Sequence, residues 1–559
     1  MIRDDFSCTR ISIIANLLIC SLVSACGGGG STTTESTATA TSASSVTFGT
    51  AAVSSTRMAA SPVAIATSRS AYVSPLAVKS ASALGRQTSP TTAATTTVAE
   101  LQASNGAAWP FVQPPLATLR ASGKKVFAHY FTPFPVSIDN LAAPADYYGV
   151  NYLVAQGEGG KFAGSGGYIK QRPLPRVPQS GAWDQIDALQ EVRRAVALGI
   201  DGFAVDLLAS SGPHWDRARR MLDSANAVDT GFKILLMPDM TAEFQSQPQN
   251  VIVAVRALAA HPAAYRLADG RLVLAPYNAQ SQSVGWWTAL IASLHAEGIQ
   301  VAFFPIFQGW YKYAATYAPI SVGLSDWGTR SPTPNRKDLG TAAQAHGYKT
   351  WWMDTVAPQD SRPKDFLYWE ARNSENYRVM WENAIAGGSD WVHIVSWNDY
   401  SEASEIAPSS GTQWSFYDLT AYYTAWFKTG NKPAITRDVL FYFHRRQATT
   451  AAPSTLQTHA YTLATGSDAP ANDIELLAFT TAPGTLRATI GGKVFEQAVA
   501  AGMATLRVPL AEGTATFTLL RNGITVTSVS SAFNISNSII FQDMLYRSGS
   551  SARGPVAPQ

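Results

Sequence analysis

Eight short apolar runs alternate with longer amphipathic stretches across the middle of this chain. Apolar runs of this length, bounded by polar residues, are typical of buried strands, and apolar residues at helical spacing predict helices between them. Eight such units over roughly 300 residues predict an α/β fold of the (β/α)8 TIM-type barrel class. The predicted strands span residues 126–131, 202–208, 233–240, 272–277, 301–307, 320–327, 350–356 and 391–399.

An open, doubly wound sheet is the alternative for alternating strands and helices. Such a sheet would usually carry a glycine-rich phosphate-binding sequence directly after its first strand. In this chain the glycine clusters at residues 157–160 and 164–167 instead lie inside a long connection, residues 132–182. That connection is long enough to form one wall of a cleft. The pattern therefore favours the barrel.

The last predicted strand ends in a group of polar and aromatic side chains. Asp399 and Glu402 lie three residues apart at its carboxyl end, which is where a barrel places its catalytic residues. Hydrolysis of a glycosidic bond needs such a pair, because one carboxylic acid protonates the leaving oxygen while a carboxylate activates water or attacks carbon. The alternative interpretation is a strand end with a solvated Asp-Glu turn and aromatic residues that belong to the core.

Polar side chains also follow several other predicted strands. Because all strands of a barrel end at the same face, these side chains are expected to surround Asp399 and Glu402. Asp206 and Asp239 are the strongest candidates for holding sugar hydroxyls or for tuning the catalytic pair. We expect Trp397 and Tyr400 to offer flat apolar faces to a sugar ring. The predicted substrate-binding residues are His129, Tyr130, Asp206, Asp239, Trp327, Trp397, Asn398 and Tyr400.

The segment Ser396-Trp-Asn-Asp-Tyr-Ser-Glu402 resembles the Trp-Asn-Asp-Tyr-x-Glu segment of glycoside hydrolase family 71, the endo-acting α-1,3-glucanases also called mutanases. The likeness extends over about residues 124–430 and includes Gly202-Phe-Ala-Val-Asp206 and Tyr368-Trp-Glu-Ala-Arg372. Ser401 stands where the family usually has glycine, and Met237-Pro-Asp239 stands where its third strand commonly reads Ser-Phe-Asp. These departures bear on the linkage that is cleaved more than on the hydrolase class.

The resemblance implies an endo-acting hydrolase of α-1,3-glucan, such as mutan or fungal cell-wall glucan, that inverts configuration. It then implies that Glu402 is the general acid and that Asp399 is the base that positions water. Carboxyl oxygens about 6.5–9.5 Å apart would agree with inversion, whereas about 5 Å would require a covalent intermediate. Two alternatives stay open: a related barrel glycosidase acting on another polysaccharide such as α-mannan, and a non-catalytic glycan-binding surface lipoprotein.

The amino-terminal residues resemble a bacterial lipoprotein signal. Residues 11–23 form an apolar stretch shorter than a comfortable membrane span, and Val23-Ser-Ala-Cys26 resembles a lipobox. The chain's other cysteines, Cys8 and Cys20, precede it, so a chain that begins at Cys26 would have a single cysteine, available for lipid attachment. An ordinary secretory signal is the alternative. We therefore expect a lipid-anchored protein of the bacterial cell envelope, at the outer membrane or cell surface, or else a secreted protein.

Composition divides the chain into five predicted parts. A signal peptide is followed by a Ser-, Thr- and Ala-rich tether that cannot bury enough apolar surface to fold. After the catalytic part come short alternating runs with turn pairs at Gly491-Gly492 and Asn522-Gly523, which predict a C-terminal β-sandwich. Whether that sandwich binds glucan or shields the barrel stays open. The predicted parts are residues 1–26 (signal), 27–107 (disordered tether), 108–432 (barrel), 433–545 (β-sandwich) and 546–559 (disordered tail).

Charge and motif content exclude several other functions. The net charge of +3 over 559 residues comes without a clustered basic stripe, so no nucleic-acid partner is expected. The eight histidines show no metal-binding spacing, and no Gly-x-Ser-x-Gly sequence stands at a strand-to-helix turn. We expect no metal, no cofactor and a monomer. The expected partners are a polysaccharide substrate and a membrane reached through the N-terminal lipid.

Overall fold

The computed structural model describes residues 96–555. Cys26, the predicted signal and most of the predicted tether lie outside these residues. All described residues belong to one compact unit. None of the helices between residues 96 and 555 is both long enough and apolar enough to span a membrane.

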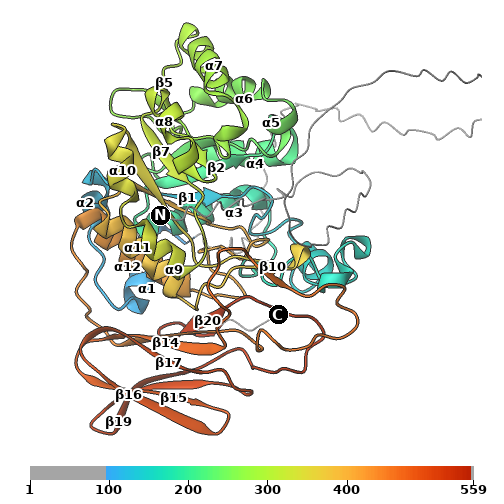
Figure 1. Ribbon diagram of the computed structural model, residues 1–559, viewed down its shortest axis with the longest axis vertical. Coiled ribbons are helices and arrows are strands. Elements are labelled where there is room, and N and C mark those ends of the chain that lie inside the picture. The colour runs from blue at the N-terminus through green and yellow to red at the C-terminus, as the bar shows by residue number, and fades with distance from the viewer. Residues whose placement is uncertain (1–95, 556–559) are drawn as a thin grey trace, which may run out of the picture. The chain divides into compact units, whose positions relative to one another are not determined.

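A nine-stranded parallel sheet forms the centre of the mixed α/β part (Figure 1). Its strands run in the spatial order β5-β4-β3-β2-β1-β11-β8-β7-β6. All of the predicted runs contribute to this sheet, which confirms the predicted α/β class with parallel strands. The strands are β1 (Lys125–Tyr130), β2 (Gly202–Leu207), β3 (Lys233–Pro238), β4 (Leu272–Leu274), β5 (Val301–Phe303), β6 (Ile306–Phe307), β7 (Gly323–Asp326), β8 (Trp351–Val356) and β11 (Trp391–Ile394).

The two edge strands of this sheet, β5 and β6, are consecutive in the sequence. Only Phe304 and Pro305 separate β5 from β6, at positions predicted to lie within one strand. Tyr277, which follows β4, forms parallel bridges to both Asp239 and Ile306. The backbone amides of Phe304 and Ile306 donate hydrogen bonds to the carbonyls of Leu274 and Pro276, so the segment from β5 to β6 lies beside β4 and the residues that follow it.

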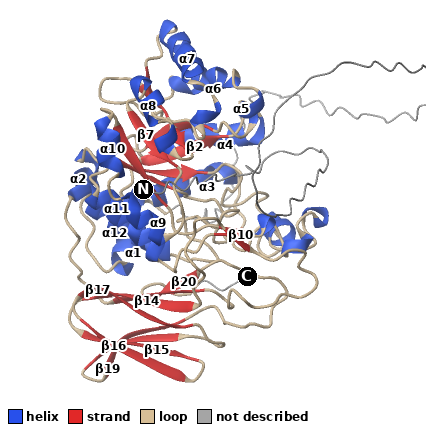
Figure 2. Ribbon diagram, viewed as in Figure 1, coloured by secondary structure: helices blue, strands red, loops and turns tan. Residues whose placement is uncertain are grey.

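Helices lie around the strands, as Figure 2 shows in blue. The predicted amphipathic stretch becomes α3, which ends at Gly199, whose φ of 82° is accessible to glycine without strain. Every residue of β2 is buried, as expected for a strand covered on both faces. The longer helices of this part are α3 (Trp183–Leu198), α4 (Gly212–Val228), α6 (Asn250–Ala259), α7 (Val284–Ala296), α10 (Thr341–Gly347), α11 (Glu375–Ala386) and α12 (Ser415–Thr429).

Two four-stranded antiparallel sheets form the C-terminal part, with the orders β17-β14-β12-β20 and β16-β15-β18-β19. They share one buried apolar cluster that includes Leu440, Leu476 and Phe517. The predicted turn pair Asn522-Gly523 has φ values of 53° and 76°, as a two-residue hairpin turn requires. The strands are β12 (Val439–His444), β14 (Asp473–Thr480), β15 (Gly484–Ile490), β16 (Lys493–Val499), β17 (Gly502–Pro509), β18 (Thr516–Arg521), β19 (Ile524–Ser530) and β20 (Arg547–Ser550).

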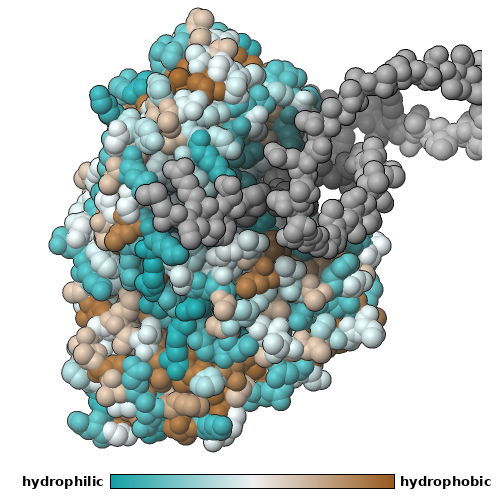
Figure 3. Space-filling view, in the orientation of Figure 1, coloured by the Kyte–Doolittle hydropathy of each residue, from teal (hydrophilic) through white to brown (hydrophobic). Residues whose placement is uncertain are grey.

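Exposed apolar residues occur on the outer strands of these sheets. Val494 on β16 is 59% exposed and Ile524 on β19 is 73% exposed. Figure 3 shows hydrophobic residues gathered toward the lower edge of the visible face, where Figure 1 places the C-terminal sheets. Val494 and Ile524 are aliphatic, and an aliphatic side chain does not offer the flat ring face on which a sugar stacks.

The folded part extends beyond the predicted boundaries at both ends. The predicted tether ends in helix α1 (Val98–Ala108), because a Thr97–Glu100 capping box starts the helix and Leu101 is buried beneath it. The predicted disordered tail contains β20, which pairs with β12 and is fully buried. The prediction of disorder is therefore wrong for residues 98–107 and 546–550, where short segments are held by tertiary contacts that composition does not reveal.

Buried polar contacts join the C-terminal part to the connection between β8 and α11. The Arg445 guanidinium lies 2.9 Å from the Glu370 carboxylate, to which the Tyr546 hydroxyl also donates at 2.5 Å. The Gln359 side chain both donates to the Tyr546 carbonyl, at 3.2 Å, and accepts from its amide, at 2.9 Å. The change of strand pattern near residue 433 thus separates two kinds of sheet and not two compact units.

Candidate active site

Asp399 lies in a tight loop that follows β11, with its carboxylate held by the loop itself. Oδ1 of Asp399 accepts hydrogen bonds from the Ser401 amide at 2.9 Å, the Ser401 hydroxyl at 2.7 Å and the Glu402 amide at 3.2 Å. The Asp399 amide donates to Oγ of Ser396 at 2.6 Å. Ser401 is thus one of the residues that orient this carboxylate.

Glu402 meets an arginine from a different part of the chain. Arg362, in the short strand β9 (Ser361–Arg362), places its guanidinium 3.0 Å from Oε1 of Glu402. The same guanidinium pairs with the buried Asp360, at 2.6 Å. The Ser361 amide donates to the Glu402 carbonyl at 2.7 Å, which fixes the two segments side by side.

Burial raises the pKa of both carboxyls. It raises the pKa of Glu402 to about 7, with the Arg362 charge opposing and the Asp360 and Asp399 charges adding to it. It also raises the pKa of Asp399, against the hydrogen bonds from Ser401 and Glu402 and the Arg362 charge. Because the Asp399 charge raises the pKa of Glu402, the ionisation of one carboxyl group affects that of the other.

Strand-end residues from β1, β2, β3 and β7 gather near this pair. Nε2 of His129 lies 3.9 Å from a carboxylate oxygen of Asp206, and the His129 ring meets Trp327 edge-on at 5.3 Å. Burial raises the pKa of Asp206 well above its usual value, and the nearby Asp239 and Asp399 charges raise it further. Burial raises the pKa of Asp239 to about 6. The predicted convergence of strand ends is therefore present for these residues.

Several of these side chains carry a polar atom that has no partner within the described chain. Such atoms are Oδ1 of Asp206, Nδ1 of His129, Nε1 of Trp327 and Oε2 of Glu402. Buried polar atoms are nearly always hydrogen-bonded, so each of these requires a partner from solvent or ligand. Donors and acceptors together, beside an indole ring, suit a neutral ligand rich in hydroxyl groups.

His393 is a further residue of this cluster, and it was not predicted. It lies within β11, fully buried, with its ring 5.8 Å from Trp327 and 6.0 Å from His129. Burial lowers the pKa of His393 to about 3. Burial also lowers the pKa of His129 well below its usual value, and the neighbouring His393 and Arg330 lower it further. Both histidines are therefore neutral at ordinary pH and can both donate and accept a hydrogen bond.

Four predicted substrate-binding residues instead hold the protein together. The Trp397 ring is fully buried, packs on Phe203 at 5.1 Å and donates from Nε1 to Glu191 at 3.1 Å. The Tyr130 hydroxyl also donates to Glu191, at 2.8 Å. Tyr130 follows His129 in a strand, so the two side chains point to opposite faces. The structure therefore places Trp397 in the core and Tyr130 on the face of β1 opposite to the His129 cluster, so neither side chain joins that cluster.

Asn398 and Tyr400 anchor the connection that follows β1. The Asn398 side chain accepts from the Phe131 amide at 2.8 Å and donates to the Phe134 carbonyl at 2.8 Å. Tyr400 is 2% exposed and packs edge-on against Phe134 at 5.9 Å. Both side chains are buried by these contacts and support the connection, and direct contact with substrate stays a prediction for them. Within this polar and aromatic segment, Asn398 and Tyr400 thus position the loop.

Residues 96–555 contain no group of three or more His, Cys, Asp or Glu residues placed to hold a metal ion. Lipid attachment at Cys26 falls outside the described residues and stays a prediction.

Comparisons with known proteins agree in the family they indicate. A family model described as "Glycosyl hydrolase family 71" matches residues 177–547. The "Ascus wall endo-1,3-alpha-glucanase" of Schizosaccharomyces pombe is 24% identical over 251 residues, 40% of this chain and 54% of that protein. The chain thus spans about half the length of that relative. The "Glucan endo-1,3-alpha-glucosidase agn1" of the same organism is 21% identical over 369 residues, 61% of this chain and 84% of that protein.

Among solved structures, the GH99 endo-alpha-mannosidase from Bacteroides thetaiotaomicron matches with a TM-score of 0.43 and 15% sequence identity. The match covers 54% of this chain and 97% of that chain.

Proposed function

The chain belongs to glycosyl hydrolase family 71, and from this premise we propose that it is an endo-acting hydrolase of α-1,3-glucan. The observation that carries the proposal is the carboxyl pair of Asp399 and Glu402 beside buried, unpartnered polar atoms of Asp206, His129 and Trp327. Such a site offers proton transfer and hydroxyl recognition together. The names of the relatives support α-1,3-glucan as the substrate.

We propose that Glu402 is the general acid and Asp399 the general base. Protonated Glu402 gives its proton to the glycosidic oxygen as the bond to the anomeric carbon breaks. Asp399 accepts a proton from the water that attacks that carbon from the opposite face, which gives inversion. The pKa of Glu402, about 7, supports the acid role because much of the group is protonated near neutral pH. Three hydrogen bonds to one oxygen of Asp399 support its role as the carboxylate.

The other strand-end residues then hold the sugar. We propose that Asp206 and Asp239 bind hydroxyl groups, that His129 donates or accepts as the bound sugar requires, and that Trp327 supplies its indole nitrogen. Each contact satisfies a side chain that is otherwise buried at a cost. Binding that is stronger in the transition state would add to the rate.

A reducing-sugar assay on a panel of insoluble polysaccharides tests the function. We expect α-1,3-glucan to yield soluble oligosaccharides of several lengths, as endo-cleavage requires, and nuclear magnetic resonance to detect the β-anomer first. Release of oligosaccharides from α-mannan but not from α-1,3-glucan would show that the protein is a glycoside hydrolase with a substrate other than α-1,3-glucan. Binding without any release would identify a glycan-binding protein instead.

We also propose three finer structural assignments. The first is a closed (β/α)8 barrel, supported by the bridges of Tyr277 to Asp239 and Ile306. The second is a β-sandwich, supported by the apolar cluster between the two antiparallel sheets. The third is a monomer carried on a lipid at Cys26 in the bacterial cell envelope, supported by the lipobox-like sequence.

A further inference from the structure

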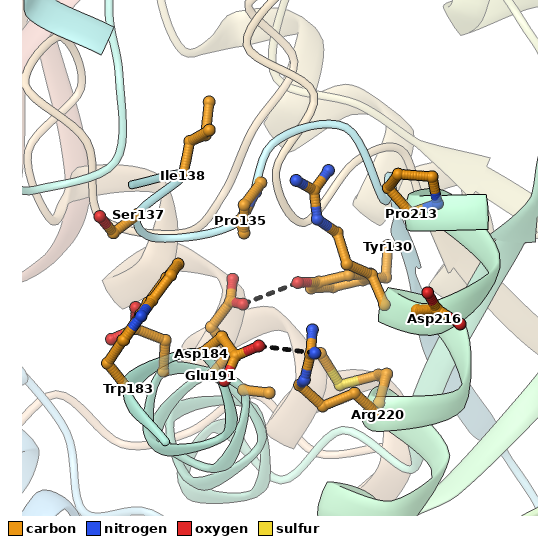
Figure 4. Close-up of a pocket in the computed structure, with 14 residues that line it drawn as sticks. Tyr130, Pro135, Ser137, Ile138, Trp183, Asp184, Glu191, Pro213, Asp216 and Arg220 are labelled. Atoms are coloured by element: carbon orange, nitrogen blue, oxygen red, sulfur yellow. Dashed lines mark hydrogen bonds and ion pairs between the residues drawn. The ribbon is translucent and has the colours of Figure 1, made fainter. Parts of the chain in front are cut away.

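A cavity of about 270 Å³ lies between the first turns of α3 and α4 and the connection after β1 (Figure 4). Its lining includes Trp183, Asp184, Glu191, Asp216 and Arg220. Figure 4 shows Trp183 on one side, Asp216 and Pro213 on the other, and the hydrogen bond between Glu191 and Tyr130 between them. The volume lies just below the range of about 300–1,000 Å³ that is typical of small-molecule sites.

The charges around this cavity largely neutralise one another. Arg220 lies 2.6 Å from Asp184, and Arg176 lies 2.5 Å from Asp187. Glu191 is buried and accepts hydrogen bonds from Tyr130 and Trp397. An anionic ligand would meet four lining carboxyl groups, and a cationic ligand would meet the lining guanidinium groups of Arg217 and Arg220. The lining therefore suits a neutral ligand.

The lining of the cavity contains both apolar side chains and charged side chains with planar carboxylate or guanidinium groups. Trp183, Pro135, Pro213 and Met221 provide apolar surface, and carboxylates and guanidinium groups provide pairs of acceptors and donors. A pyranose ring has an apolar face and a rim of hydroxyl groups, so it uses both kinds of surface at once. The Arg176 guanidinium lies 5.7 Å from the Trp183 ring centre and steadies the indole at the cavity wall.

We propose that this cavity is a second carbohydrate site, which binds one or two glucosyl residues of an α-glucan chain outside the catalytic centre. The proposal rests on the proposed function. Helices α3 and α4 begin where strands end, so the cavity lies at the same face of the parallel sheet as Asp399. His129 and Tyr130 are adjacent in β1 and point to the catalytic cluster and to the cavity respectively. A polymer that occupies both sites gains affinity by making the second contact intramolecular.

Binding to insoluble α-1,3-glucan, measured by depletion of protein from the supernatant, tests the proposal. A Glu402→Gln background prevents cleavage during the assay. Trp183→Ala removes the aromatic wall and Asp216→Ala removes an exposed carboxylate on the opposite side. We expect each to raise the half-saturating glucan concentration by about three- to tenfold. Trp351→Ala is the matched control, because Trp351 is 40% exposed at the first residue of β8, the opposite end of the sheet from Asp399.

Thermal melting verifies that each variant is folded. If Trp183→Ala does not fold, the glucan binding of Asp216→Ala alone tests the proposal. The proposal is overturned if both folded variants bind as tightly as the Glu402→Gln parent, if Trp351→Ala loses as much affinity as they do, or if the parent does not bind. The proposed function is decided separately, by hydrolysis of the same glucan by the protein with Glu402 intact. Binding that depends on Trp183 without any hydrolysis would overturn the function and leave the second site in place.

Discussion

The guanidinium of Arg362 lies 3.0 Å from Oε1 of Glu402, although the two residues belong to different loops. Its charge lowers the pKa of Glu402, while burial raises it, and the balance is about 7. A general acid works best when its pKa is close to the working pH. In the proposed mechanism, the arginine therefore keeps Glu402 from holding its proton too tightly to transfer it.

Removing either of the two proposed proton-transfer groups should abolish most activity. Asp399→Asn and Glu402→Gln keep the shape of each side chain, so we expect folding to persist and kcat to fall by about 10²- to 10⁴-fold or more. Initial rates on α-1,3-glucan measure the effect. Asp390→Asn, at the other end of β11, is the control and should retain full activity. A variant of Asp399 or Glu402 that keeps most of its rate would show that the residue has another role.

Replacing Arg362 should move the pH profile of the enzyme upward. Arg362→Gln removes a positive charge that lowers the pKa of both Glu402 and Asp399, so both pKa values rise. Both limbs of the kcat/KM profile should then shift by about one pH unit or more to higher pH. Arg362→Lys keeps the charge and should shift them less. An unchanged alkaline limb in Arg362→Gln would contradict Glu402 as the acid.

Asp354 should make the protein less stable as the pH rises. Burial raises the pKa of this carboxyl to about 7, so between about pH 4 and pH 7 the folded state holds its proton while the unfolded state has lost it. The free energy of unfolding therefore falls with pH across that window. Asp354→Asn does not titrate, and its stability relative to the parent should rise by up to about 1.4 kcal/mol per pH unit.

Melting temperatures of parent and variant at pH 5 and pH 7.5 measure this difference. The exposed Asp269 has a lowered pKa, because Arg271 donates to it, and it titrates below the window. Asp269→Asn should therefore show the same pH dependence as the parent. If the difference in melting temperature between Asp354→Asn and the parent is the same at pH 5 and pH 7.5, Asp354 is ionised in the folded state over that whole range.

Activity should not depend on a metal ion, because a carboxylate activates the water in the proposed mechanism. We expect dialysis against a strong chelator to leave the rate on α-1,3-glucan unchanged. Loss of activity that a divalent cation restores would require a different mechanism.

Cys26→Ala should release the protein from the membrane fraction. The predicted lipid is attached through that sulfur, and the residue is far in sequence from the catalytic part. Fractionation followed by an activity assay on soluble oligosaccharide should find unchanged specific activity in the soluble fraction. A processed variant that stays with the membrane would reveal another anchor.

Strand positions were predictable from the sequence because buried parallel strands are continuous apolar runs. The end of the last strand was not, since β11 stops at Ile394 and not at Asp399. From there the chain is held by side-chain hydrogen bonds such as that from the Asp399 amide to Ser396. Apolar periodicity carries no information about such bonds.

Candidate site residues can be proposed from the sequence where a polar side chain ends an apolar run, as at Asp206 and Asp239. Arg362 gives no such signal, because it reaches Glu402 from a loop about 40 residues away in sequence, whose path depends on tertiary contacts. The burial of Glu191 could not be predicted from the sequence for a different reason. It lies in an amphipathic helix, where a carboxylate is ordinarily solvated, and only the structure shows it 4% exposed beneath Trp397.

The double hydrogen bond between Gln359 and Tyr546 ties catalytic assembly to the order of synthesis. Gln359 begins the loop that carries Arg362, and its partner leaves the ribosome after every strand of the parallel sheet. During translation the nascent chain can pair those strands while this loop still lacks its backbone partner. We therefore expect the loop that carries Arg362, the partner of Glu402 in the proposed mechanism, to be fully held only after the segment around Tyr546 has docked.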